Sequence, residues 1–209
     1  MNVIVFGATG SVGRLAVERI LAKGHRVTAF ARHPEQLALQ HRGLTLHAGD
    51  AMNAADVQQA MAGHQAVVIT LGAGANRKNR VRSQGTENII NAMQRHGIRR
   101  LICQSTLGVG ESWSNLNFFW KHIMFGVLLR PVFQDHERQE AVVRGSHLEW
   151  TIVRPSAFTD QPASGSYRID VPPWVNNLTL TISRADIADF LARCVVDTGF
   201  VQRAVAISN

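Results

Sequence analysis

Short apolar runs alternate along the chain with segments that repeat apolar residues at helical spacing. The apolar runs are residues 3–6, 26–30, 44–47, 66–71, 100–105, 150–154 and 201–207. Runs of this length, bounded by glycine and polar turns, are typical of buried strands. Segments 14–22, 56–62, 83–96 and 183–196 predict helices between them. This alternation predicts an α/β fold, a doubly wound (Rossmann) parallel β-sheet with helices on both faces.

The 209 residues are enough for one well-buried core and too few for two substantial domains. No linker, internal repeat or low-complexity tract interrupts the alternation of strands and helices. We therefore expect a single domain over residues 1–209.

The first predicted strand runs straight into a glycine-rich turn, Gly7-Ala8-Thr9-Gly10-Ser11-Val12-Gly13, which opens the first helix. Gly7 would allow a tight turn, Gly10 a close approach of the backbone to phosphates, and Gly13 close packing of helix on strand. An anion would then lie on the free N–H groups at the positive end of the helix. The spacing predicts a site for the pyrophosphate of a dinucleotide.

Arg32 stands at the end of the second predicted strand, where an acidic residue often binds the adenine ribose. A carboxylate there would repel a 2′-phosphate, whereas a guanidinium binds it through a planar fork of donors. The sequence therefore favours NADP(H) over NAD(H) as the cofactor.

The residues that follow the other strands complete the predicted site, because ligands lie across the carboxyl ends of such a sheet. Asp50 either accepts from the adenine amino group or only starts a helix-initiating turn. Small residues at 71–75 would let the backbone approach the riboses, and Ser105 and Ser156 would lie near the nicotinamide. The expected cofactor-binding residues after the glycine turn are Arg32, Asp50, Ala51, Leu71, Gly72, Ser105, Pro155 and Ser156.

The formal net charge of +7 indicates affinity for anions, and a nucleotide with a 2′-phosphate is one of them. The basic residues are scattered and accompany no known nucleic-acid-binding motif, so we expect no nucleic-acid partner.

The histidines lack the spacing of a metal site, so we expect no bound metal. Cys103 and Cys194 are predicted to be small core residues. Because the first strand starts at residue 2 and no apolar run is long enough to span a bilayer, we expect a cytoplasmic protein.

The most apolar part of the chain lies between the fifth and sixth predicted strands, at about residues 111–133. It is too short to span a membrane, so three uses remain open. The segment forms a wall or lid on the substrate side, a subunit contact, or an interfacial segment in peripheral contact with a membrane. The expected oligomeric state is a monomer or a homodimer.

With these motifs in view, the chain resembles the atypical short-chain dehydrogenases/reductases, and within them the NAD(P)-binding NmrA-like branch that includes flavin (biliverdin IX-beta) reductases. The resemblance extends over nearly the whole chain. It rests on Phe6-Gly7-Ala8-Thr9-Gly10, residues 27–32, Gly49-Asp50, residues 66–72, residues 83–97, Asp135-His136, Asp160-Gln161-Pro162 and residues 183–188. It implies that the glycine turn, Arg32, Asp50, Leu71, Gly72, Ser105 and Pro155 line NADPH.

The chain departs from the wider superfamily because it has no Tyr-x-x-x-Lys, the pair that transfers a proton to carbonyl substrates. Laid on the family pattern, Val132 takes the place of the tyrosine and His136 that of the lysine. The candidate catalytic residues are then His136 and Ser105, which would hydrogen-bond either the nicotinamide amide or the acceptor. With an unperturbed pKa near 6.5, His136 would orient the ribose or relay a proton, or else be an ordinary exposed helix residue.

Without that pair, hydride transfer suits an acceptor whose extended π system spreads the incoming charge: a flavin, a quinone or a tetrapyrrole. The leading hypothesis is an NADPH-dependent reductase of such a small, planar, apolar substrate. The alternative is an NmrA-like redox-sensing regulator that binds NADP(H) without turnover.

Overall fold

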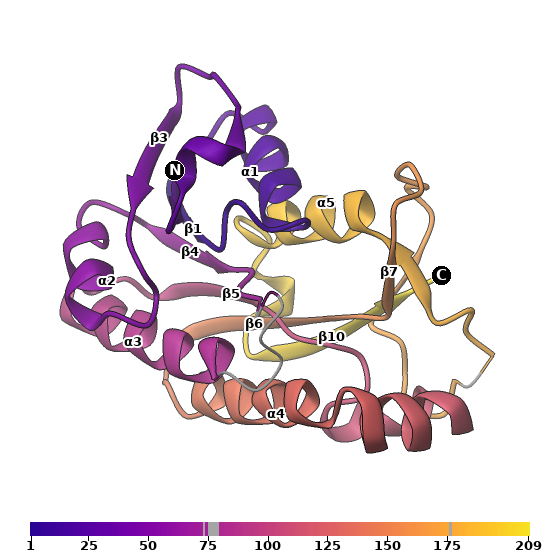
Figure 1. Cartoon of the computed structure of the whole chain (residues 1–209). Helices are drawn as coiled ribbons and strands as arrows, with labels where there is room; N and C mark the ends of the chain where they lie inside the picture. Colours follow the sequence, from indigo (N-terminus) through magenta and orange to yellow (C-terminus); the bar gives the residue numbers. More distant parts are fainter. Residues whose placement is uncertain (73, 75–79, 176) are drawn as a thin grey trace.

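The computed structural model describes residues 1–72, 74, 80–175 and 177–209. Its largest feature is an eight-stranded sheet in the order β3-β2-β1-β4-β5-β6-β10-β8 (Figure 1). The strands are β1 (Asn2–Phe6), β2 (Arg26–Ala31), β3 (Leu44–Ala48), β4 (Ala66–Ile69), β5 (Arg100–Gln104), β6 (Glu149–Pro155), β8 (Arg168–Ile169) and β10 (Arg203–Ser208). Every neighbouring pair is parallel except β8 with β10. The predicted doubly wound sheet is confirmed, with one short antiparallel edge strand.

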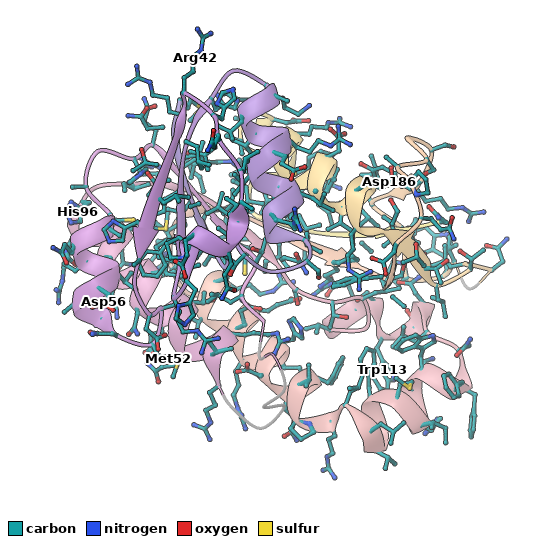
Figure 2. All side chains as sticks on the ribbon, turned by 45° about the horizontal axis from the view of Figure 1, so that its top comes forward. Arg42, Met52, Asp56, His96, Trp113 and Asp186 are labelled. Carbon is teal, nitrogen blue, oxygen red and sulfur yellow. The ribbon has the colours of Figure 1, made fainter. Side chains whose placement is uncertain are left out.

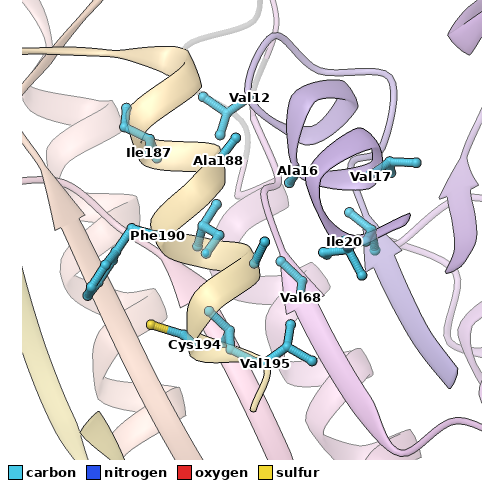
Figure 3. Packing of buried hydrophobic residues seen from close by; sticks show 14 of the residues in the cluster. Val12, Ala16, Val17, Ile20, Val68, Ile187, Ala188, Phe190, Cys194 and Val195 are labelled. Atoms are coloured by element: carbon cyan, nitrogen blue, oxygen red, sulfur yellow. The ribbon is translucent and has the colours of Figure 1, made fainter. Parts of the chain in front are cut away.

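Helices cover both faces of this sheet. Helices α1 (Gly13–Ala22) and α5 (Arg184–Cys194) lie side by side on one face, where their apolar residues pack over Val68 of β4 (Figure 3). Helices α2 (Ala54–Ala60), α3 (Val81–Arg95) and α4 (Arg130–Arg144) cover the other face. Because both faces are buried, the central strands are apolar throughout instead of alternating.

The ends of the predicted elements shift by a few residues, and capping explains one shift. Helix α2 begins at Ala54 because the side chain of Asn53 accepts a hydrogen bond from the backbone N–H of Ala55. At α5 the expected cap is present, since Ser183 accepts from the backbone N–H of Asp186 and donates to its carboxylate. Asp186, labelled in Figure 2, also accepts from the backbone of Ser164 and Gly165, which ties that loop to α5.

Several short elements were not expected from the sequence. A second, two-stranded sheet pairs β7 (Ala157–Thr159) with β9 (Thr181–Ser183). The other short elements are η1 (Pro34–Leu37), η2 (Gly110–Asn115), the π-helix η3 (Phe119–Leu128) and η4 (Thr198–Phe200). In Figure 2, Trp113 of η2 lies beside the helices that follow it, and its ring centroid is 5.5 Å from that of Phe133 in α4. Segments of two or three residues carry no periodic signal, so pattern alone could not find these strands.

A buried ion pair fixes α4 against the sheet. Arg154 of β6 donates from Nε and Nη2 to the two carboxylate oxygens of Glu140, at 2.9 and 2.7 Å. Both side chains are almost fully buried. Nη1 of Arg154 lies 2.8 Å from Oε1 of Glu111, which brings the start of η2 to the same place. The polar interior of this face therefore positions the segments that follow β5.

The chain reverses its direction of travel across the sheet next to β1. From β1 it proceeds outward to β2 and β3, and then returns to place β4 on the other side of β1. In open α/β sheets such a switch point leaves a crevice beyond the carboxyl ends of the strands. The glycine turn after β1 lies at this crevice.

Candidate functional site

The glycine turn is held in a conformation that its side-chain-free residues permit. Gly7 has φ of +82°, and a Cβ there would lie 2.7 Å from the carbonyl oxygen of Thr70. A Cβ on Gly13 would lie 2.1 Å from the carbonyl oxygen of Gly7. The tight turn at Gly7 and the close packing at Gly13 agree with the sequence-based expectation, while the approach of Gly10 to a ligand stays a prediction.

Thr70, which directly follows β4, stabilises this turn through its side chain. Its Oγ1 donates to the carbonyl oxygen of Phe6 at 3.0 Å. Helix α1 then begins at Gly13 with no side-chain cap and no acidic residue in its first turn. The positive end of α1 is therefore open to an anion.

A cleft of about 810 Å³ crosses the carboxyl ends of β1 to β5. Its lining brings together most of the site residues predicted from the sequence: Gly7, Thr9, Gly10, Ser11, Val12, Arg32, Asp50, Ala51, Leu71, Gly72, Ser105 and His136. Three predicted residues do not line it: Gly13, Pro155 and Ser156. Gly13 packs beneath the turn, and Pro155 is buried at the end of β6, where its carbonyl oxygen accepts from the N–H of Leu107. Ala73 and Ala75, among the small residues at 71–75, lie outside the described residues.

The end of the cleft that is expected to hold the adenosine is lined by Arg32 and Asp50. Arg32 directly follows β2 and is exposed at the rim of the cleft. Oδ1 of Asp50 accepts from the backbone N–H of Met52 at 2.9 Å, so this carboxylate forms the helix-initiating turn. Asp50 also lines the cleft, and its contact with an adenine stays a prediction.

A second cavity of about 350 Å³ adjoins the cleft at its other end. The two share Arg82, Thr106, His136 and Phe158 in their linings. Ser156, expected near the nicotinamide, lines only this second cavity. A reactive ring at the end of the cleft would therefore face the space in the second cavity.

The apolar segment predicted at residues 111–133 directs some of its side chains into this cavity and others toward solvent. Its inward side chains form one wall of the second cavity: Leu116, Trp120, Phe125, Leu129 and Val132. Its outward side chains are exposed on the surface: Phe118, Phe119, Ile123, Val127 and Leu128. The expected wall is therefore present on one side of the segment, while the subunit and membrane contacts remain predictions for the other.

Two polar groups at the end of β5 face the cleft without a protein partner. Ser105 is 1% exposed, and its Oγ forms no hydrogen bond among the described residues. Oε1 of Gln104 is likewise buried and unpartnered there. A buried polar atom without a partner is costly, so both atoms are suited to bind a ligand.

His136 lies at the candidate site, but its environment differs from the one expected. It is 8% exposed and lines both cavities, so it is not an exposed helix residue. Burial, together with the positive charge of Arg82, lowers the pKa of His136 to about 3. The expectation of an unperturbed pKa near 6.5 is therefore wrong. The lowered pKa favours the neutral imidazole near pH 7, and its unpartnered Nδ1 is placed to hydrogen-bond a ligand. The two expected roles, orienting the ribose and relaying a proton, stay predictions.

The sequence analysis missed two residues that shape the candidate site, Asp135 and Arg82. Asp135 of α4 is buried and accepts from the backbone N–H groups of Arg82 and Ser83 at 3.1 and 3.2 Å, and from Oγ of Ser83 at 2.6 Å. It thus caps α3 from the neighbouring helix. Arg82, held by this cap, places its guanidinium where the two cavities meet. The Asp135-His136 pair was visible in the sequence, but nothing there showed that it packs against residue 82.

The family follows from comparison with known sequences. A family profile described as NAD(P)H-binding matches residues 7–198, which is most of the chain. The chain belongs to this NAD(P)H-binding family. It is an atypical short-chain dehydrogenase/reductase, and the predicted class of cofactor is confirmed as NAD(P)H.

Curated relatives of this NAD(P)H-binding protein include named reductases. It is 26% identical to (4-alkanoyl-5-oxo-2,5-dihydrofuran-3-yl)methyl phosphate reductase of Streptomyces griseus, over 99% of this chain and 67% of the relative. Other relatives are longer. The chain spans 31% of a 3-beta-hydroxysteroid dehydrogenase of Mycolicibacterium neoaurum, with 37% identity over 113 residues, which are 48% of this chain.

Solved structures with the same fold cover the whole chain. ChuY, an anaerobilin reductase of Escherichia coli O157:H7, is 26% identical with a TM-score of 0.79, and the match covers 97% of ChuY. A short-chain dehydrogenase/reductase of Veillonella parvula, solved with NADP, is 20% identical with a TM-score of 0.83 over 94% of that chain. The second likeness concerns the fold alone.

Within the described ranges, no group of three or more His, Cys, Asp or Glu residues is placed to hold a metal ion. In the same part of the chain, every helix is too short or too polar to cross a membrane.

Proposed function

We propose that this protein is an NADPH-dependent reductase that transfers hydride to a planar conjugated acceptor: a flavin, a quinone or a linear tetrapyrrole. The observation that carries the proposal is the junction of two cavities. A cleft built on the glycine turn meets a largely apolar cavity at Thr106, His136 and Phe158. The bound cofactor would supply the hydride, and the protein would supply position and shelter from water.

The residues present fit a dinucleotide. The glycine turn and the uncapped end of α1, which has no acidic residue in its first turn, would hold the pyrophosphate. The unpartnered Oγ of Ser105 would bind the nicotinamide amide. Arg32, at the rim of the adenosine end, supports a preference for the 2′-phosphate of NADPH.

The acceptor must need little acid catalysis from the protein. Val132, in the family position of the tyrosine, lines the second cavity and carries no proton to donate. His136, in the position of the lysine, is neutral because burial lowers its pKa to about 3. Charge delivered with the hydride would therefore be delocalised in the acceptor itself, as in flavins, quinones and linear tetrapyrroles.

The test is oxidation of NADPH, followed by its near-ultraviolet absorbance, with FMN, riboflavin, small quinones, biliverdin and anaerobilin in parallel. We expect turnover with at least one of them, and the named activity of ChuY supports the choice of tetrapyrroles in this assay. Absence of turnover with all of them would contradict the proposal.

The alternative is a redox-sensing regulator that binds NADP(H) without turnover, favoured by the lack of a proton donor at Val132 and His136. It predicts nucleotide binding that differs between the oxidised and reduced forms, with no oxidation of NADPH. Under either function, we propose a cytoplasmic monomer or homodimer without a nucleic-acid partner.

A further inference from the structure

The polar groups of the second cavity are unusual for a site that takes an apolar ring. Its described lining contains two arginines, Arg82 and Arg184, and no Asp or Glu. Most of the remaining lining is apolar or aromatic. Two cations in a small, largely apolar cavity favour the binding of an anion, because a charge in a poorly hydrated site is costly when no opposite charge compensates it.

Arg82 is the more buried of the two cations. Its side chain is 12% exposed, and its Nε and Nη1 donate to no partner among the described residues. The nearest carboxylate is that of Asp135, whose Oδ2 lies 3.8 Å from Nη1. That carboxylate already accepts two backbone N–H groups and the hydroxyl of Ser83. The guanidinium of Arg82 is therefore electrostatically near Asp135, yet its donors remain free for a ligand.

Arg184 and Ser156 add free donors to the same cavity. Nη1 of Arg184 donates to the exposed Asp160 at 2.7 Å, but its buried Nε has no partner in the described structure. The guanidinium lies over the ring of Phe158, with 5.7 Å from Cζ to the ring centroid. Ser156 is 4% exposed, and its Oγ is also unpartnered.

We propose that the second cavity selects a flat acceptor that carries a carboxylate or similar oxyanion, which Arg82 and Arg184 bind while the aromatic wall holds the ring. The inference rests on the proposed reductase function, whose acceptor class it narrows. A neutral ring would leave the free guanidinium donors buried and unsatisfied, whereas an oxyanion satisfies several of them with charge-assisted hydrogen bonds.

The test compares matched acceptors by binding, so that it does not depend on turnover. With saturating NADP⁺, dissociation constants are measured by calorimetry for biliverdin and its neutral dimethyl ester, and for naphthoquinone sulfonate and neutral menadione. We expect the anionic member of at least one pair to bind at least tenfold more tightly. In Arg82→Gln this advantage should fall at least tenfold, with the neutral member unchanged.

Two further variants make the result specific. Arg138→Gln removes the same charge from an exposed position on α4 outside both cavities, and it should bind like the wild type. Arg184→Gln should also lose anion affinity, and it decides the question if Arg82→Gln does not fold. Its helix cap depends on Ser183 and Asp186, so this substitution leaves the cap intact.

Equal binding within both pairs, or no binding of either anion, would overturn the inference. It would also be overturned if Arg82→Gln weakened NADP⁺ instead of the anion, because the guanidinium would then belong to the cofactor site. Selective, arginine-dependent anion binding without oxidation of NADPH would support this inference while contradicting the reductase function.

Discussion

Arg32 carries the expected choice between the two nicotinamide cofactors. It lines the cleft directly after the last residue of β2, the place where the sequence predicts contact with a 2′-phosphate. We expect Arg32→Ala to weaken NADPH binding by about 1.5–3 kcal/mol, the range for a lost charged hydrogen bond, and to leave NADH nearly unchanged. Fluorescence titration with both cofactors measures this.

Arg26→Ala is the matched control for Arg32, since Arg26 is exposed at the opposite end of β2 and lines neither cavity. It should leave both affinities unchanged. If Arg32→Ala weakened NADPH and NADH equally, Arg32 would not distinguish the two cofactors.

His136 makes stability depend on pH in a defined direction. In the unfolded chain the imidazole takes up a proton at its ordinary pKa of 6.5, whereas burial holds the folded pKa near 3. The unfolded state therefore binds more protons between these values, and stability falls as pH falls, by about 1.4 kcal/mol per pH unit. In His136→Asn we expect this part of the slope to vanish between pH 6 and 4.

Urea unfolding of the wild type and His136→Asn at several pH values measures the difference in slope. His122→Gln, at an exposed position, should keep the wild-type slope. Parallel curves for the wild type and His136→Asn would mean that the folded imidazole titrates normally.

At the scale of elements, the junction of β1 and α1 depends on the absence of a side chain at Gly13. A Cβ there would overlap the carbonyl oxygen of Gly7 at 2.1 Å, so the turn or the helix must move. We expect Gly13→Ala to cost at least about 1–3 kcal/mol of stability and to abolish nucleotide binding. Thermal unfolding and NADP⁺ titration test this.

Gly145→Ala controls for the substitution itself. Gly145 ends α4 with φ of −76°, and a Cβ there would contact its neighbours at 3.4 Å or more. This variant should keep its nucleotide affinity and nearly all of its stability. Normal NADP⁺ binding by Gly13→Ala would show that the turn adjusts.

The attachment of α4 to β6 depends on the buried pair of Glu140 and Arg154. Removal of one charge leaves the other buried with poorer compensation, which costs about 3–5 kcal/mol in such pairs. Because Glu111 also contacts Arg154, we expect the loss of stability in Glu140→Gln to lie near the lower end of this range. Denaturant unfolding measures the free energy of unfolding of this variant and of the control Glu137→Gln, which changes an exposed residue on the same helix. Equal stability of the two variants would contradict the prediction.

At the scale of the whole molecule, the segment after β5 forms one wall of the second cavity. Trp120 lines the cavity, whereas Phe118, two residues earlier, is 72% exposed. We expect Trp120→Ala to raise the acceptor KM several-fold, since it removes part of the wall. Phe118→Ala should leave acceptor and NADPH kinetics unchanged.

Steady-state kinetics with a turned-over acceptor separates these two variants. Equal effects on KM would mean that the outward side of the segment also contacts substrate. Sedimentation of both variants at several concentrations would test the proposed monomer or homodimer, because only Phe118 is exposed enough to reach a partner.

Much of the fold and the cofactor end of the site could be predicted because their determinants are local. Buried parallel strands are continuous apolar runs, and the turn after β1 needs glycines at fixed spacing. Both features are therefore determined by residues that are close together in the sequence. Arg32 was found in the same way, from its place after a strand. Thr70, which fastens the turn, was not found because its role depends on the pairing of β1 with β4.

The sequence by itself determined the class of sheet, the place of the glycine turn and the place of Arg32 after the second strand. Only the tertiary structure decided the burial of His136 and the position of Arg82 between the two cavities. Both depend on α3 packing against α4, which buries the imidazole, brings the guanidinium near it and directs Asp135 to the start of α3. Protonation and free hydrogen-bond donors are set by neighbours that are distant in the chain, and no local pattern encodes them.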